Sequence, residues 1–377
     1  MSRIVNRRLH ALRWWLCICT AGAALAVAVV VVVRPGVTFH AQQETLPLRG
    51  RWVPTNLRLG VHTLLADPHQ RGLLLAGTTS GVWRSTNGGA TWRPDGRGPQ
   101  EVIFALSAPG DGRTVLAGAF DGAVYARDST GSVRWRPISP PLQTLSTDNT
   151  AQRGPGSNVG SSSSASEVAP IVSLAVSPKG RTALAGSLGT LYRGEKVGLH
   201  WSWQQVLANG HAAMTSILWP PWDAHLVFAT IFEHVPPVVV SHDGGQTWHA
   251  DAAGLPASLP TQALSTGTTA THQLFLTTMG GGVWMRSSTG MWRDISTGLP
   301  QRHAMPLITS TRYPESLYAG TMGHGVYEKR DGADWQHLGR GLSGASGIVL
   351  SLAETSGPSP ALLAGTATGL FRYELPG

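Results

Sequence analysis

The chain alternates between short apolar runs and turns that carry glycine. Residues 61–66 form one apolar run, residues 73–78 a second and residues 82–85 a third, and a fourth begins at residues 91–93. Short apolar runs separated by glycine-bearing turns are typical of β-hairpins. This region therefore predicts four consecutive antiparallel strands.

The four-strand pattern recurs along the chain, and a block related to Leu-Ala-Gly-Thr marks the second strand of each copy. Steps of 41, 68, 44, 48, 42 and 45 residues separate the starts of this block, which lie at Leu75, Leu116, Leu184, Phe228, Leu276, Tyr318 and Leu363. A strand-rich repeat of this length is typical of a propeller or a solenoid, because one unit alone cannot bury its apolar face. We predict an all-β fold, a seven-bladed β-propeller of four-stranded blades.

The last copy has a third strand at residues 370–373 but no fourth strand. Residues 51–54, Arg-Trp-Val-Pro, precede the first copy and look like an unassigned fourth strand. We expect them to complete the seventh blade, because this closes the ring and removes exposed strand edges.

Tryptophans recur at one register of the repeat, in the fourth strand. The positions are Trp92, Trp135, Trp201 or Trp203, Trp248, Trp292 and Trp335. A fixed register favours packing between blades over a set of sugar-stacking rings. Trp222, in a Trp-Pro-Pro-Trp segment, falls outside this register and is the better surface candidate.

The N-terminal segment has the composition of a membrane anchor. Residues 16–33 are apolar and uncharged, and four arginines precede them. Such a run can cross a bilayer core of about 30 Å, and the arginines place the N-terminus in the cytoplasm. We predict a cytoplasmic basic leader (1–13), one transmembrane helix (14–34), a linker (35–50) and an extracytoplasmic propeller (51–377). A cleaved signal peptide is the alternative, and it would give a secreted protein.

Residues 139–169 interrupt the repeat and account for the long step of 68 residues. This stretch is rich in serine, glycine, threonine and asparagine, so it cannot bury enough apolar surface to order itself. We predict a disordered loop within the propeller, with a binding loop as the alternative.

Composition excludes several classes of function. The formal net charge is +8, but four of the arginines precede the apolar run and the remaining excess is too diffuse for nucleic acid. Both cysteines, Cys17 and Cys19, lie in the apolar run, so the repeats cannot form a disulfide or a thiolate metal site. We expect a monomer with no cofactor and no bound metal.

One turn matches the pattern Ser-x-Asp-x-Gly-x-Thr-Trp, and a second matches it with Asn in place of Asp. The matching residues are Ser241, Asp243, Gly245, Thr247 and Trp248, and then Ser85, Asn87, Gly89, Thr91 and Trp92. This pattern is the Asp-box of the bacterial neuraminidase repeat (BNR). Residues 51–377 resemble the Asp-box β-propellers, which include sialidases, sortilin-type receptor ectodomains and photosystem II assembly/stability factors. In such a turn the Asp or Asn accepts backbone N–H bonds, so we expect these residues to be structural.

The sialidase resemblance implies three arginines, a Tyr–Glu pair and an Asp, but no such set can be assigned here. The Arg-Ile-Pro motif of sialidases is also absent from the repeats. We therefore name no catalytic residue. The candidates for ligand binding are rim residues in turns between second and third strands, together with the off-register tryptophan: Asp121, Glu233, His234, His324 and Trp222. Solvated turn residues are the plainer interpretation of the first four.

Two functions remain open. The sequence favours a non-enzymatic binding or assembly scaffold for a protein or glycan partner, held near the membrane through residues 14–34. The alternative is a carbohydrate-active enzyme, a sialidase-like glycoside hydrolase with a non-standard active site. Such an enzyme would need two carboxylates facing each other across a cleft.

Overall fold

The structure is a computed structural model that divides the chain into two compact units, residues 1–49 and residues 50–377. It describes residues 50–67, 70, 72–109, 114–128, 133–142, 169–267, 272–355 and 360–375. The predicted leader, anchor and most of the linker lie outside these residues, as does most of the predicted loop 139–169. None of the helices in the described ranges is long and apolar enough to span a bilayer.

The regular secondary structure of the described residues is almost entirely β, as the sequence predicts, and its strands form six antiparallel sheets. In four of the sheets, four strands that follow one another along the chain lie side by side in the same order. The first two contain β2 (Val61–Ala66), β3 (Leu74–Thr78), β4 (Gly81–Ser85) and β5 (Arg93–Pro94), and then β6 (Ile103–Ser107), β7 (Thr114–Ala119), β8 (Val124–Asp128) and β9 (Arg134–Pro137). The other two contain β17 (Thr261–Thr266), β18 (Leu274–Thr278), β19 (Gly282–Arg286) and β20 (Trp292–Asp294), and then β21 (Ala304–Thr309), β22 (Leu317–Thr321), β23 (Val326–Lys329) and β24 (Gln336–His337). The 3₁₀-helices η1 (Pro300–Arg302) and η2 (Gly344–Gly347) lie in connections between sheets.

The fifth four-stranded sheet joins the two ends of the folded unit. It contains β25 (Val349–Glu354), β26 (Ala361–Thr366) and β27 (Gly369–Glu374), and β1 (Val53–Pro54) pairs antiparallel with β27. Val53 lies opposite Arg372, and Pro54 lies opposite Phe371. The neighbouring Trp52 is only 1% exposed, and its ring packs against that of Tyr373 at 5.2 Å in a tilted arrangement. The N-terminal strand thus occupies the fourth position of the last sheet, where the sequence analysis expected it.

The sixth sheet has seven strands, which differs from the expected four. Its strands are β10 (Ser173–Val176), β11 (Thr182–Gly186), β12 (Leu188–Val197), β13 (His200–Leu218), β14 (Val227–Ile231), β15 (Val238–Ser241) and β16 (His249–Ala250). The 19-residue strand β13 pairs with β12 through its first part and with β14 through its last. The chain does not turn at Asn209-Gly210, although Gly210 has a φ of 73°. One strand therefore does the work of the two strands that the repeat predicts.

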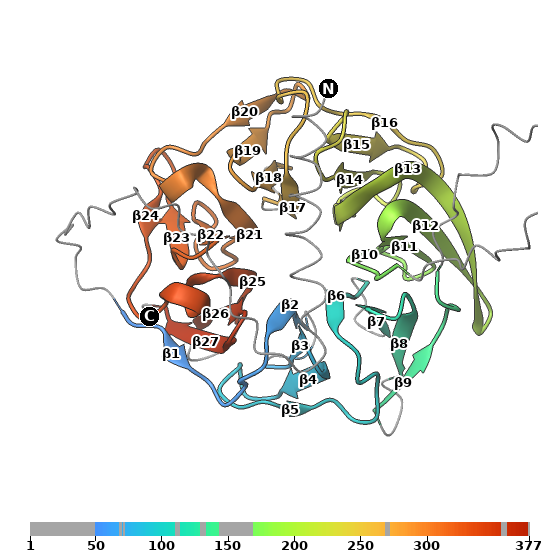
Figure 1. Cartoon of the computed structure of the whole chain (residues 1–377), viewed down its shortest axis with the longest axis horizontal. Coiled ribbons are helices and arrows are strands. Elements are labelled where there is room, and N and C mark those ends of the chain that lie inside the picture. Colours follow the sequence, from blue (N-terminus) through green and yellow to red (C-terminus); the bar gives the residue numbers. More distant parts are fainter. Residues whose placement is uncertain are drawn as a thin grey trace, which may run out of the picture. The chain divides into compact units, whose positions relative to one another are not determined.

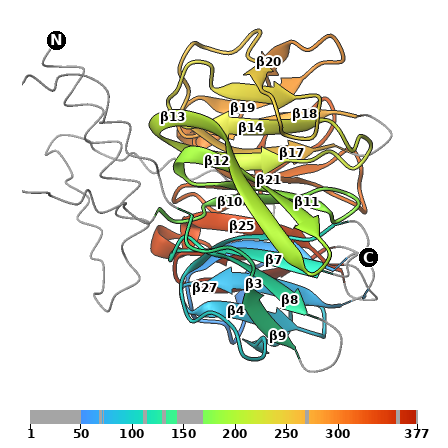
Figure 2. The same cartoon turned by 90° about the vertical axis from the view of Figure 1, so that its right-hand side faces the viewer.

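The sheets surround a common axis, with the first strand of each sheet innermost (Figure 1). Contacts run from β2 to β6, β10, β13, β17, β21 and β25, and then from β25 back to β2. Figure 2 shows the same sheets from the side, with their strands running between the two faces of the ring. The described part of residues 50–377 is therefore a closed ring.

The Ala-Gly-Thr block has a physical reason in two of its residues. At Gly77 a Cβ atom would lie 2.9 Å from the carbonyl oxygen of Ile103, and at Gly365 it would lie 2.8 Å from that of Val61. The first strand of the next sheet passes too close for any side chain there. The threonine hydroxyl closes the following turn: Thr78 donates to the Gly81 carbonyl at 2.9 Å, and Thr366 donates to that of Gly369 at 2.8 Å.

Apolar clusters fill the boundaries between neighbouring sheets. One cluster combines Leu363 and Leu370 of the last sheet with Leu74 and Ala76 of β3. Each sheet thus buries its apolar faces only against its neighbours, and hydrophobic burial stabilises the ring at every boundary.

The fourth-strand tryptophans bind the sheets to one another with hydrogen bonds. The indole N–H of Trp335 donates to the Ile295 carbonyl at 2.8 Å, and its backbone N–H donates to the Thr297 carbonyl at 2.9 Å. Both acceptors belong to the segment that leaves the preceding sheet. We call this two-bond arrangement the tryptophan clamp. In the clamp of Trp52, the indole N–H donates to the Leu338 carbonyl and the backbone N–H to the Arg340 carbonyl. In the clamp of Trp292, the corresponding acceptors are the carbonyls of Asp251 and Ala253. Trp135 makes the backbone bond to Arg97 and directs its indole N–H to the buried Asp95 carboxylate at 3.0 Å.

The first strands β2 and β25 each contain a β-bulge at the same point of the repeat, so the residues at the two bulges occupy equivalent positions in the ring. The register shifts around His62 in β2 and around Leu350 in β25. His62 packs edge-on against Phe104 at 5.1 Å, and its Nε2 has no hydrogen-bond partner among the described residues. Burial lowers the pKa of His62 to about 4.

The first prediction concerns the clamp. Trp335→Phe keeps an aromatic side chain but deletes the indole N–H, so the half-buried Ile295 carbonyl loses its donor. We expect the free energy of unfolding in urea to fall by about 1–3 kcal/mol. Trp83→Phe is the control, because its indole N–H donates to Ser80 at an exposed position within its own sheet. Equal losses in the two variants would contradict the role of the clamp.

The second prediction concerns His62. Its lowered pKa means that the unfolded chain binds the proton more tightly, so stability is fully present above pH 6.5 and is lost as the pH falls toward 4. This loss amounts to at most about 3 kcal/mol. His62→Leu, which copies Leu350, should flatten the dependence of unfolding free energy on pH between 7.5 and 5. An unchanged pH profile in this variant would show that His62 is not responsible.

Candidate functional site

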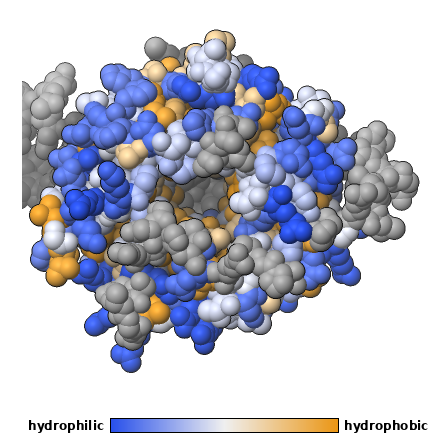
Figure 3. Space-filling view, turned by 180° about the vertical axis from the view of Figure 1, so that it is seen from behind, coloured by the Kyte–Doolittle hydropathy of each residue, from blue (hydrophilic) through white to orange (hydrophobic). Residues whose placement is uncertain are grey.

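The ring has two faces that carry different sets of turns. One face, here the connection face, carries the turns between second and third strands and the connections between sheets. Hydrogen bonds join these two sets of loops: the Gly280 N–H donates to Arg302, and the Gly323 N–H donates to Gly347. The opposite face, here the hairpin face, carries the other turns, including the Asp-box matches. Figure 3 shows the ring from behind the view of Figure 1, with mostly hydrophilic residues around a central hollow.

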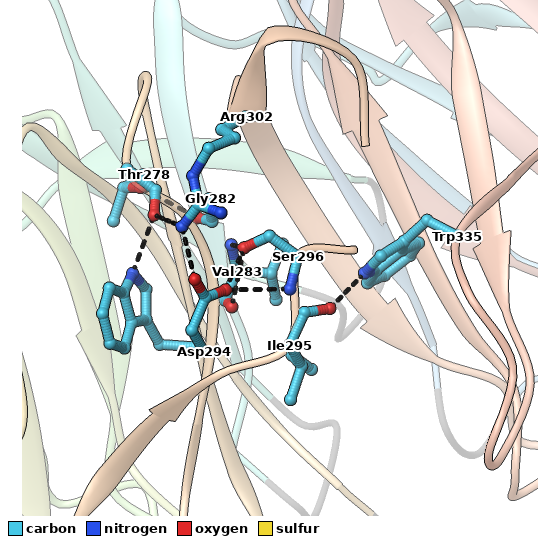
Figure 4. Close-up of polar contacts among 10 residues, drawn as sticks. Thr278, Gly282, Val283, Asp294, Ile295, Ser296, Arg302 and Trp335 are labelled. Atoms are coloured by element: carbon cyan, nitrogen blue, oxygen red, sulfur yellow. Dashed lines mark hydrogen bonds and ion pairs between the residues drawn. The ribbon is translucent and has the colours of Figure 1, made fainter. Parts of the chain in front are cut away.

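An ion pair on the connection face organises the loop between β20 and β21. Arg302 donates to the Asp294 carboxylate at 2.6 Å and to the Gly281 carbonyl at 2.9 Å. Asp294 also accepts bonds from the backbone N–H and the hydroxyl of Ser296, and the Ser296 hydroxyl accepts the Val283 N–H at 2.9 Å (Figure 4). These bonds lower the pKa of Asp294 against the opposing effect of its partial burial. The carboxylate therefore stays charged and holds Arg302 in place.

The same loop contains unusual backbone. Gln301 and Arg302 follow each other with φ values of 49° and 55°, in the left-handed region that side chains other than glycine rarely adopt. Such conformations are costly and persist where surrounding contacts enforce them, often at functional sites. Here the enforcing contacts are the two bonds of the Arg302 guanidinium. Both side chains are exposed, so the strained segment is presented to solvent.

Three histidines gather beside this loop. Burial lowers the pKa of His303, and the neighbouring His324 lowers it further. Burial also lowers the pKa of His337, whose ring packs edge-on against Tyr327 at 5.2 Å. A hydrogen bond to the His324 backbone opposes that shift. The structure thus places the predicted candidate His324 between two histidines that the sequence analysis did not select.

Asp121 lies on the connection face in another sheet. It accepts the Ala123 N–H at 2.9 Å and the Tyr125 hydroxyl at 2.6 Å. Burial raises the pKa of Tyr125, and the charges of Asp121 and Glu101 raise it further. Tyr125 is therefore a protonated donor, and two carboxylates lie close enough to act on it.

The other predicted candidates lie apart from this group. Glu233 and His234 belong to the turn between β14 and β15; Glu233 is exposed, with a φ of 48°, and its backbone N–H donates to Leu259. Trp222 lies in the turn between β13 and β14, on the hairpin face, where its ring stacks on His272 at 4.7 Å. The five candidates lie in four different turns, and Trp222 is on the opposite face from the other four.

The two Asp-box matches adopt the same turn. Gly245 and Thr247 donate their backbone N–H groups to the Ser241 hydroxyl at 2.8 Å and to the Asp243 carboxylate at 2.9 Å. The Thr247 hydroxyl adds a bond to Asp243 at 2.6 Å, which is the main cause of the strongly lowered pKa of that carboxyl. The near match repeats these bonds at 2.9–3.0 Å: Gly89 to Ser85, and Thr91 to Asn87. These side chains are committed to shaping turns.

The Asp-box turns also press against strands that precede them in the ring. A Cβ atom at Gly89 would lie 2.7 Å from Leu363, and one at Gly245 would lie 2.8 Å from Leu184. Leu363 belongs to β26 of the last sheet, and Leu184 belongs to β11 of the same seven-stranded sheet that carries the Gly245 turn. The glycine of the motif therefore permits close packing between neighbouring parts of the ring.

The described residues hold no group of three or more His, Cys, Asp or Glu side chains arranged to bind a metal ion.

Comparisons with known proteins agree with this architecture. The model of the BNR/Asp-box repeat matches residues 239–250, which span the strict Asp-box and β16. An ancestral GH74 enzyme aligns with a TM-score of 0.62 at 16% identity over 87% of this chain and 46% of its own. The extracellular domain of a one component system from B. thetaiotaomicron gives 0.61 at 15% identity over 85% of this chain and 39% of its own. The chain thus spans less than half of either structure.

The WD40 β-propeller domain of Doa1 aligns with a TM-score of 0.60 at 9% identity over 86% of this chain and 95% of its own. At such identities these similarities show the fold alone. No curated protein matches the sequence. The fold is that of a β-propeller, and one of its turns matches the BNR/Asp-box repeat, as the Asp-box residues predicted.

The third prediction concerns the strict Asp-box. Asp243→Ala deletes the acceptor of the Gln246 and Thr247 bonds, so the free energy of unfolding in urea should fall by about 1–2 kcal/mol. Asp243→Asn should lose less, because Asn87 makes the corresponding bond in the near match. Partner binding should survive in both variants once they are folded. A loss of binding without a loss of stability would contradict the structural role.

Proposed function

We propose that this protein is a non-enzymatic binding scaffold whose connection face recognises a protein or glycan partner. The observation that carries the proposal is the exposed loop at Gln301 and Arg302, with its two consecutive left-handed residues held by an ion pair to Asp294. A strained loop that is fixed before binding loses little conformational entropy on contact with a partner. The similarity of the fold to an extracellular domain of a one component system is compatible with this role.

The architecture of the proposed scaffold is a seven-bladed ring, with β13 counted in two blades. The pairing of β13 with β12 on one side and β14 on the other supports this count. We also propose that residues 14–34 anchor the ring to a membrane, with the propeller on the extracytoplasmic side and secretion after cleavage as the alternative. The apolar run and the preceding arginines support this part of the proposal.

A glycoside hydrolase is the second candidate, and one observation favours it. Asp121 and Glu101 both raise the pKa of Tyr125, so two carboxylates lie near one face of the ring. Glycoside hydrolysis commonly uses two carboxylates. Against this, both oxygens of Asp121 already accept hydrogen bonds, from Ala123 and Tyr125. The raised pKa of Tyr125 also opposes its use as a nucleophile.

The fourth prediction tests the scaffold. A photo-crosslinking amino acid at Gln301 should give a defined adduct in membranes of the producing cell, whereas the same residue at Met291 should not. Met291 is the control because it is 53% exposed and lies on the hairpin face. Arg302→Ala should reduce the Gln301 adduct about fivefold or more, since it releases the loop. The cost in stability should stay near zero to 1 kcal/mol, because the ion pair is solvent-exposed.

Equal adducts at both positions, or an adduct unaffected by Arg302→Ala, would contradict recognition through this loop. A panel of fluorogenic glycosides and plant polysaccharides tests the second candidate in parallel. Turnover by the natural chain that disappears in the Asp121→Asn and Glu101→Gln double variant would establish an enzyme and overturn the scaffold. We expect the natural chain and the double variant to give the same turnover in this panel.

A further inference from the structure

A cationic pocket lies on the hairpin face, at the boundary between the β6–β9 sheet and the β10–β13 part of the seven-stranded sheet. Its volume is about 510 Å³, and the residues that line it are Pro109, Thr114, Lys179, Gly180, Arg181, Lys196 and Gly198. Three of these seven side chains are cations, and none of the others is charged. The pocket is remote in chain position from the connection-face loop of the proposed function.

The turn between β10 and β11 supplies two of the cations. Lys179 and Arg181 flank Gly180, whose φ of 67° shapes the turn. A Cβ atom at Gly180 would lie 3.3 Å from Pro109, so the two sheets come into contact at this point. The Lys196 N–H donates to the Arg181 carbonyl at 2.8 Å and thereby ties the third cation to the same turn. The three cations are therefore held on neighbouring pieces of backbone.

Within the part of the chain that the structure describes, no carboxylate neutralises these cations. No ion pair joins Lys179, Arg181 or Lys196 to any carboxylate whose side chain the structure describes. Glu195, the nearest acidic residue in sequence, pairs instead with Arg193. Side chains alternate along a strand, so Arg193 and Glu195 point to one side of β12 and Lys196 to the other. Arg193 reaches the next Asp-box turn, where it donates to the Gly244 carbonyl at 2.9 Å.

An aromatic pair lies on the same side of the hairpin as Lys196. Lys196 is directly opposite Trp201 in the β12–β13 register, and directly opposite residues project from the same face of an antiparallel pair. The rings of Trp201 and Trp203 stack at 5.9 Å with an interplanar angle of 23°. Both rings are half-buried and pack against the cluster shared with the β6–β9 sheet. The aromatic pair thus lies beside Lys196 on the hairpin, next to the residues that line the pocket.

We propose that this pocket binds an oligosaccharide that carries carboxylate or sulfate groups. The three cations provide charge-assisted hydrogen bonds to acidic groups, and arginine offers paired donors that match a carboxylate. The volume exceeds what a single phosphate requires, and an aromatic face suits the apolar side of a sugar ring. The inference goes beyond the proposed function, because this site is on the opposite face and uses none of the residues of the Arg302 loop.

The fifth prediction is a binding experiment with the full chain in detergent. The probes are a tetragalacturonate, a sulfated heparin tetrasaccharide, neutral maltotetraose and inorganic phosphate, and the readouts are calorimetry and tryptophan fluorescence. At least one acidic tetrasaccharide should bind and change the fluorescence, and its dissociation constant should rise with salt because charged contacts are screened. Maltotetraose should not bind.

Removing the cations separates a site from general attraction. The triple variant Lys179→Ser, Arg181→Ser and Lys196→Ser should weaken binding at least about tenfold. The control triple variant Arg93→Ser, Arg134→Ser and Arg136→Ser removes the same charge from exposed positions on β5 and β9 and should bind as the natural chain does. Trp201→Phe should reduce the fluorescence change. Thermal unfolding of each variant checks that it is folded.

Three results would overturn the proposal: no binding of either acidic tetrasaccharide, equal weakening in both triple variants, or full displacement by phosphate at an equal concentration. The last result would show a simple anion site instead. Arg302→Ala serves as a further control and should leave saccharide binding unchanged. The crosslinking experiment thus tests the connection-face scaffold, and the saccharide titration tests the pocket, so one proposal can fail without the other.

Discussion

Hydrogen bonds that tryptophans donate across three boundaries between sheets, at Trp52, Trp292 and Trp335, constrain the geometry of the ring. In the clamp of Trp335, one N–H group is on the indole and the other is on the backbone, and the acceptors Ile295 and Thr297 both belong to the preceding sheet's exit segment. Apolar packing at the same boundaries is non-directional, so it favours contact without setting an angle. The clamp adds direction, and at Trp52, Trp292 and Trp335 it fixes a sheet relative to the one before.

This constraint also positions the connection face. The acceptors Ile295 and Thr297 stand just before the loop that carries Arg302, so the clamp of one sheet holds the start of the loop that emerges from another. Asp294 then fixes the other end through its bond to Arg302. Residues 294–297 therefore link the conformation of the Arg302 loop to the packing of neighbouring sheets. The sheets thereby hold the polar groups of this face, Asp294 and Arg302, in fixed positions.

The fold could be predicted from the sequence because each copy of the repeat needs the same residue types at the same positions. Gly77 is needed where the next sheet approaches, and Thr78 is needed where the turn closes, so both recur with the period. The histidine group escaped prediction because its members come from a connection, a turn and an outer strand, with no common spacing. The left-handed Arg302 was also invisible, since nothing in Leu-Pro-Gln-Arg marks a positive φ. The pocket cations were missed because two adjacent sheets are needed to form the cavity.

The shared strand β13 has a mechanical consequence. A continuous backbone joins the β10–β12 part of the seven-stranded sheet to its β14–β16 part, with ladder hydrogen bonds on both sides. These two parts cannot separate without breaking a strand, whereas the ladder between β1 and β27 has only two residue pairs. Opening of the circle under heat or force should therefore start at the seam between the chain's two folded ends and reach the β13 region last.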